Sequence, residues 1–136
     1  MPTKTYLNEL SYKIIGCAIE VHKHFGPGLL ESMYQMCFVE ELKLQGLKVQ
    51  SQVYYPVTYK SSNLGGTFKI DLIIEDEIIV ELKAVEAMIP LFQAQLLSYL
   101  KLTGKTKGLL INFNCEVIKE QVKSIVTENF RRLDWE

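Results

Sequence analysis

Residues 68–84 read FKIDLIIEDEIIVELKA, and this stretch decides the fold. Two apolar runs rich in isoleucine flank the acidic residues 75–77, which predicts a β-hairpin with a three-residue turn. Asp71, Glu81 and Lys83 stand inside the apolar runs, where a strand would ordinarily carry valine or isoleucine. Charged side chains at these three positions therefore need a physical reason.

The turn at residues 75–77 fixes how the two strands pair. Ile74 then lies opposite Ile78, and Asp71 lies opposite Glu81 with Lys83 on the diagonal. A slip of one residue would set polar side chains against apolar ones, which burial disfavours. Because strand side chains alternate between faces, one face of the first strand is expected to carry Phe68, Ile70, Leu72 and Ile74, and the other Lys69, Asp71 and Ile73.

Two carboxyl groups in this pairing would lie about 5 Å apart at their Cβ atoms and would repel each other. A raised pKa with a shared proton, the ammonium group of Lys83, or a divalent cation would offset the repulsion. The alternative is an exposed hairpin face on which Asp71, Glu81, Lys83 and Lys69 form a ladder of charges. Taken alone, the stretch favours neither the metal site nor the ladder.

The rest of the chain predicts helices and further strands around this hairpin. Pro56 indicates an edge position or a bulge, residues 61–66 (SSNLGG) are expected to be a turn, and residues 116–126 fit a helix or a strand. The expected order is α-α-β-β-β-α-β, a mixed α/β (α+β) fold with helices flanking a central mixed β-sheet. The expected helices cover about residues 8–24, 29–45 and 89–101, and the further strands residues 48–60 and 108–113.

Length and composition predict one folded domain over residues 1–136, with 48% hydrophobic and 23% charged residues. No apolar run approaches the roughly 20 residues that span a bilayer, and no signal-peptide segment is visible, so we expect a cytoplasmic protein without a membrane partner. Cys17, Cys37 and Cys115 lack metal-type spacing and are expected to be reduced thiols. The net charge of −1 supports nucleic-acid binding only weakly, although it leaves room for a basic patch.

Further motifs give the hairpin a context. GLLESMY, residues 28–34, has the form GxxExxY, and the segment around it resembles the opening of the GxxExxY protein family. That family is placed in the PD-(D/E)XK nuclease superfamily, and the resemblance covers roughly residues 22–126. It implies a restriction-endonuclease-like core.

The hairpin resembles the active-site pattern of that superfamily, because Asp71 is followed by Glu81 and Lys83 as ExK. Ile70 replaces the proline of the superfamily's name, a departure that is common among relatives. Gln95 and Tyr99 resemble the QxxxY motif of the RecB-type branch. ExK alone is a weak signal, whereas the ordered set of these motifs is a strong one.

The resemblance implies roles for these residues. Asp71, Glu81 and the backbone carbonyl of Leu82 would hold Mg²⁺ or Mn²⁺, which would polarise a phosphodiester and lower the pKa of a water molecule. Lys83 would position that water or stabilise the charge that builds on the phosphate. Glu31 would add a third carboxylate; its alternative role is to complement the dipole of the helix that it begins.

Four other side chains are weaker candidates. Gln95 and Tyr99 share a helix face and would form a polar edge of the site, although a core tyrosine beside a surface glutamine fits the spacing equally. His22 and Tyr34 would line the site or serve the structure alone. His24 is expected on the surface.

These motifs indicate a metal-dependent nuclease that hydrolyses the phosphodiester bonds of nucleic acid, with DNA favoured over RNA. The alternative is a non-catalytic module that keeps the nuclease fold and binds nucleic acid or a protein. Hydrolysis of another phosphate ester has no specific support. The small size of the chain leaves a homodimer open.

Overall fold

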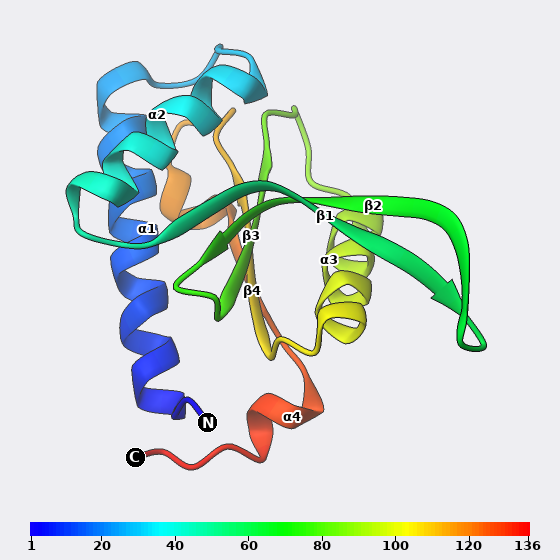
Figure 1. Cartoon of the computed structure of the whole chain (residues 1–136). Helices are drawn as coiled ribbons and strands as arrows, with labels where there is room; N and C mark the ends of the chain where they lie inside the picture. Colours follow the sequence, from blue (N-terminus) through cyan, green and yellow to red (C-terminus); the bar gives the residue numbers. More distant parts are fainter.

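The computed structural model describes residues 1–136 as a five-stranded sheet with helices on both faces (Figure 1). The expected order of elements is confirmed, and residues 116–126 form both a 3-10 helix and a strand. The elements are α1 (Lys4–Phe25), α2 (Glu31–Leu44), β1 (Val49–Tyr59), β2 (Ser62–Ile74), β3 (Ile78–Lys83), α3 (Pro90–Thr103), β4 (Lys107–Asn112), the 3-10 helix η1 (Ile118–Gln121), β5 (Val122–Val126) and α4 (Glu128–Arg131).

The sheet is mixed, as expected. Its strands follow the order β1-β2-β3-β4-β5, and all neighbours are antiparallel except β3 and β4, which are parallel and connected through α3. All six residues of β4 and the first five of β3 are buried, because helices cover both faces of the sheet centre. These two strands form the rigid platform from which Glu81 and Lys83 project.

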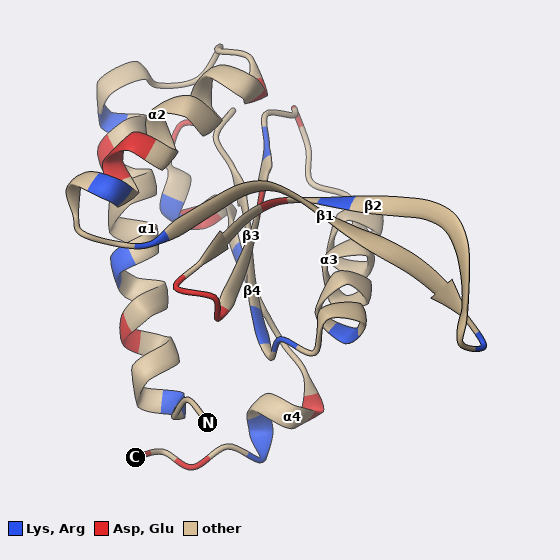
Figure 2. Cartoon of the chain, in the orientation of Figure 1, with Lys and Arg blue, Asp and Glu red and all other residues tan.

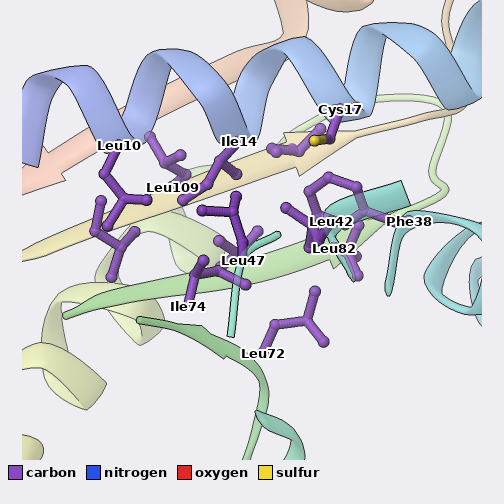
Figure 3. Close-up of a cluster of buried hydrophobic side chains, with 14 of the residues drawn as sticks. Leu10, Ile14, Cys17, Phe38, Leu42, Leu47, Leu72, Ile74, Leu82 and Leu109 are labelled. Carbon is purple, nitrogen blue, oxygen red and sulfur yellow. The ribbon is translucent and has the colours of Figure 1, made fainter. Parts of the chain in front are cut away.

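The first face of the sheet is covered by α1 and α2, which form the larger core with it (Figure 3). The side chain of Thr3 caps α1 by accepting a hydrogen bond from the Tyr6 N–H at 3.1 Å. The apolar side of α1 is buried up to Val21, whereas Phe25 at the helix end is 46% exposed. None of the helices has the length and apolar character needed to cross a membrane.

The second face is covered by α3 alone. Leu96 and Leu100 of this helix pack on Ile73, Ile79 and Leu110 of the sheet. A Cβ atom on Gly108 would lie 2.9 Å from a methyl carbon of Leu96, so a glycine is needed in β4 for α3 to approach this closely. Pro90 begins α3 and Gly104 follows its end in a left-handed conformation, as these residue types favour.

The β1–β2 hairpin is longer than expected. The prediction of a turn over residues 61–66 was wrong, because β2 already begins at Ser62 and the turn consists of Lys60 and Ser61, with φ of 49° and 68°. The pairing shifts register between Pro56 and Thr58, and β1 is an edge strand, so both predictions for Pro56 are confirmed.

Candidate active site

The β2–β3 hairpin pairs as the sequence predicts near its turn. Leu72 lies opposite Val80, Ile73 opposite Ile79 and Ile74 opposite Ile78. The turn closes through a hydrogen bond from the Glu77 N–H to the Ile74 carbonyl at 3.0 Å. Glu75 and Asp76 adopt positive φ angles of 52° and 57° within it. The predicted turn at residues 75–77 is therefore confirmed.

The backbone pairing stops before Asp71 and Glu81, and their carboxyl groups take over. The Asp71 N–H donates to Glu81 Oε1 at 3.1 Å, and the Leu82 N–H donates to Asp71 Oδ2 at 2.9 Å. Each strand thus presents a carboxyl group to the backbone of the other. The expected meeting of the two residues occurs through side chains, although they do not form a backbone pair.

A kink beside Asp71 breaks the expected alternation of β2. Leu72 and Ile74 pack in the core under α1 and α2, but Ile70 packs with Ile73 under α3. The prediction that Ile70 and Leu72 share a face was wrong. The neighbouring strand is irregular at the same level, because Gln52, which lies between the residues paired with Leu72 and Ile70, has a φ of 52°.

The two carboxyl groups are buried, with Asp71 9% and Glu81 7% exposed. Burial is the main cause that raises the pKa of Glu81, from 4.5 to about 9, and the negative charge of Asp71 adds to it. The expected repulsion is thus present, and one carboxyl retains its proton at neutral pH. A buried like-charge pair of this kind is typical of functional sites.

Lys83 ends β3 beside the pair. Its positive charge acts against the rise in the pKa of Glu81, although its ammonium group forms no direct ion pair with either carboxyl. Its Nζ also lies 4.3 Å from the centre of the Phe92 ring in α3, a cation–π contact. The backbone of Lys83 is also fixed, since its carbonyl accepts a hydrogen bond from the N–H of Phe113, just after β4, at 2.9 Å.

Glu31 begins α2 on the same side of the molecule. Partial burial raises the pKa of its carboxyl, and the charge of Asp71 raises it further, while Lys83 and Lys69 lower it. The charges of Asp71, Lys83 and Lys69 therefore all affect the carboxyl of Glu31. Even so, no three His, Cys, Asp or Glu side chains are close enough together to form a metal-binding group, so Glu31 stands apart from the pair.

Gln95 and Tyr99 lie on α3, as predicted. Gln95 is exposed, and the ring of Tyr99 stacks on Phe68 of β2 with centroids 4.9 Å apart. Burial raises the pKa of Tyr99, and the charges of Glu81 and Asp71 raise it further. Tyr99 is therefore affected by the charges of the carboxyl pair, but it forms no hydrogen bond with either residue, and its role in the site stays a prediction.

His22 and Tyr34 are held by structural contacts. His22 Nε2 lies 2.7 Å from the Cys115 carbonyl, and the buried Tyr34 hydroxyl donates to the Gly26 carbonyl at 2.6 Å. Tyr34 also accepts from the Leu29 N–H and so fixes the loop before Glu31. Neither side chain forms a hydrogen bond with the carboxyl pair. His24 is exposed, as expected.

Three further residues surround the site, of which sequence reasoning named Lys69 only as part of a charge ladder and missed Phe92 and Asn112. Lys69 acts on Glu31, Phe92 lies under Lys83, and the buried Asn112 side chain bonds both the N–H and the carbonyl of Val85 at 3.1 and 2.9 Å. Asn112 thereby fixes the chain just after Lys83. Only Lys69 had a sequence signal, because it precedes Asp71 by two positions in one strand; the other two contacts are long-range.

The donor set suits a hard cation such as Mg²⁺ or Mn²⁺. One oxygen of each carboxyl group, Asp71 Oδ2 and Glu81 Oε1, accepts a backbone N–H, which fixes the orientation of both groups. The second oxygen of each group accepts no backbone N–H. A cation that displaces the proton held by the pair would find ligands in these second oxygens.

Comparison with known protein families gives one match. A family model described as the PD-(D/E)XK nuclease superfamily matches residues 8–125, which include every charged residue discussed above. Comparisons with curated proteins and with solved structures gave no match.

Proposed function

The chain belongs to the PD-(D/E)XK nuclease superfamily, and on this basis we propose that it is a metal-dependent nuclease that hydrolyses phosphodiester bonds of nucleic acid. The observation that carries the proposal is the buried Asp71–Glu81 pair beside Lys83. Burial of two carboxyl groups side by side costs free energy of folding, and such pairs are typical of functional sites.

In this proposal, Asp71, Glu81 and the backbone carbonyl of Leu82 hold one Mg²⁺ or Mn²⁺ ion, with Glu31 as a further carboxylate. Such an ion, when bound, polarises the phosphodiester and makes water more acidic. The hydrogen bonds from the Asp71 and Leu82 N–H groups orient the two carboxyl groups in advance, so that little ordering is left for the binding step.

The other side chains act on the substrate. Hydrolysis requires a water oxygen to bond to phosphorus, a P–O bond to break, and a proton to reach the leaving oxygen. The Lys83 ammonium group donates hydrogen bonds to the phosphate oxygens, whose negative charge increases during attack, or orients the attacking water. Gln95 and Tyr99 donate hydrogen bonds to the nucleic-acid backbone at the edge of the site.

The proposal has finer parts. Residues 1–136 act as one nuclease domain, in the cytoplasm, with DNA as the preferred substrate. The spacing of Gly28, Glu31 and Tyr34 supports the GxxExxY branch, and that of Gln95 and Tyr99 a RecB-type branch. A homodimer would add surface for gripping a duplex, and light scattering that gives a monomer mass at working concentration would remove that part.

The test is isothermal titration calorimetry with Mg²⁺ and Mn²⁺ on the wild type and on Glu81→Ala, followed by cleavage assays on DNA and RNA. The matched control is Glu77→Ala, which removes a carboxyl group at the turn of the same hairpin. Metal binding and cleavage should be lost in Glu81→Ala and kept in Glu77→Ala.

Failure of the folded wild type to cleave any DNA or RNA with Mg²⁺ or Mn²⁺ would refute the nuclease proposal. Tight nucleic-acid binding that is indifferent to metal and to Glu81→Ala would instead identify a binding module.

A further inference from the structure

The distal part of the β1–β2 hairpin, residues 53–70, forms an arm that packs on α3 at its base and projects from the body of the molecule at its tip (Figure 1). Every residue from Thr58 to Thr67 is exposed. From Asp71 to Ser62, where β2 leaves the turn, a strand rise of about 3.3 Å per residue gives a length of roughly 30 Å. A ribbon of this length that buries no apolar core at its tip contributes little to the stability of the fold.

The charge of the arm differs from that of the rest of the chain. The sequence has no Asp or Glu between Glu41 and Asp71, and the arm carries Lys60 and Lys69. The arm therefore has a charge of +2 in a protein whose net charge is −1. Figure 2 shows lysine at the tip and near the base of the arm and no acidic residue along it.

The outer face of the arm begins at the candidate site. On the inner face, Phe68 stacks on Tyr99 of α3, and its cross-strand partner Tyr55 stacks on Phe68. Tyr54 and Lys69 are the next pair, so their side chains occupy the opposite, outer face, and Tyr54 is 64% exposed. Lys69 precedes Asp71 by two positions in β2, so this outer face starts next to the carboxyl pair.

We propose that the outer face of the arm, with Tyr54 and Lys69, and its tip at Lys60 bind the sugar-phosphate backbone of nucleic acid that extends beyond the site. The inference rests on the proposed nuclease function. Lysine, exposed tyrosine and a backbone without nearby carboxylates suit a polyanion. The arm is about as long as one turn of a DNA duplex, roughly 34 Å, so it would contact about ten base pairs on one side of the cut.

A second copy of the chain fits the arm less well. The edge of β1 would have to pair with a strand of the partner, but its backbone is interrupted at two places. Gln52 has a positive φ, and Pro56 lacks an N–H at the register shift. A nucleic-acid backbone that binds through side chains does not need an uninterrupted β1 edge.

The test compares binding of DNA duplexes of 8 and 24 base pairs by fluorescence anisotropy in Ca²⁺. The arm variant is Tyr54→Ala with Lys60→Asn, because asparagine tolerates the left-handed conformation of Lys60 and Tyr54 is largely exposed. The matched control is Tyr12→Ala with Lys23→Gln, since both residues are exposed on α1. Circular dichroism establishes that all variants are folded.

The arm variant should bind the 24-base-pair duplex about tenfold more weakly, with a smaller salt dependence, and the 8-base-pair duplex as the wild type does. The control variant should match the wild type on both. Equal loss on both duplexes, or no loss on either, would overturn the proposal, as would a wild-type dimer that only the arm variant loses while its DNA binding is unchanged.

Cleavage of the same duplexes in Mg²⁺ is measured in parallel. Binding that depends on the arm without any cleavage would support the arm and refute the nuclease function. Cleavage that is identical in the wild type and the arm variant on both duplexes would support the nuclease function and refute the role of the arm.

Discussion

The two ends of the β2–β3 hairpin follow different rules. At the turn, isoleucine pairs with isoleucine in regular backbone register. Three residues away, the register ends, carboxyl groups replace the backbone ladder, and the neighbouring strand is kinked at Gln52. Apolar packing is enough to specify the structure of the turn end. The other end holds two carboxyl groups that apolar packing does not favour, and departures of this kind are expected at functional sites.

If only the Asp71–Glu81 end of the hairpin serves catalysis, a substitution of Lys83 should have the largest effect on kcat among the changes considered below. Lys83→Met should lower kcat for phosphodiester cleavage by roughly 100- to 1000-fold, because the charge that develops on the phosphate loses its nearest ammonium group. The matched control is Lys105→Met, since Lys105 Nζ pairs with Asp76 at the turn, 3.2 Å away. Steady-state kinetics on one DNA substrate measure both. Equal losses of kcat in the two variants would contradict the assignment of catalysis to one end of the hairpin and of stability to the other.

At the turn end, the expected effect is on stability alone. Ile79 is fully buried under α3, so Ile79→Ala should lower the free energy of unfolding by about 3 kcal/mol and Ile79→Val by about 1 kcal/mol. Urea denaturation measures both values. The kcat of the folded Ile79→Val variant should stay near that of the wild type. A loss of kcat comparable to that of Lys83→Met would show that the two ends are coupled.

The pH dependence of stability should distinguish Glu81 from Glu77. A carboxyl whose pKa is raised in the folded state favours folding while it is protonated, so stability falls as pH rises from 4.5 through about 9 for Glu81. Glu81→Gln should therefore raise the midpoint of thermal unfolding at pH 8, by roughly 5 °C or more, and much less at pH 4.

Glu77→Gln is the control at the turn. Burial also raises the pKa of Glu77, but Lys105 lowers it, so the gain at pH 8 should be smaller than for Glu81→Gln. Thermal scans across this pH range, without divalent metal, measure both. A Glu81→Gln variant that is less stable than the wild type at pH 8 would contradict the raised pKa.

The sequence predicts the regular end of the hairpin and most of the fold because those parts obey local rules. Alternating isoleucines and the acidic turn fix the register of β2 and β3, and Pro90 and Gly104 mark the ends of α3. The candidate carboxyl pair was visible because its residues break such a rule.

What the sequence could not predict depends on contacts between distant residues. The left-handed Gln52 has no turn residue beside it, and the alternation that the apolar pattern of β2 indicates breaks at the same level. The arm was also hidden, because SSNLGG is typical of a turn and only cross-strand pairing makes it part of β2. The contact of Lys83 with Phe92 arises from packing of α3 on the sheet.

The smallest effect concerns the kink itself. Gln52 is exposed and has a positive φ, whereas Gln50, exposed in the same strand, does not. Gln52→Gly should raise the free energy of unfolding by up to about 1 kcal/mol, because glycine adopts this backbone without strain. Gln50→Gly should lower it by about 0.5–1 kcal/mol, because glycine weakens an extended strand. Urea denaturation gives both signs. If Gln52→Gly is destabilising as well, Gln52 does not adopt the left-handed conformation. The strand opposite Asp71 would then be regular, contrary to the irregularity described above.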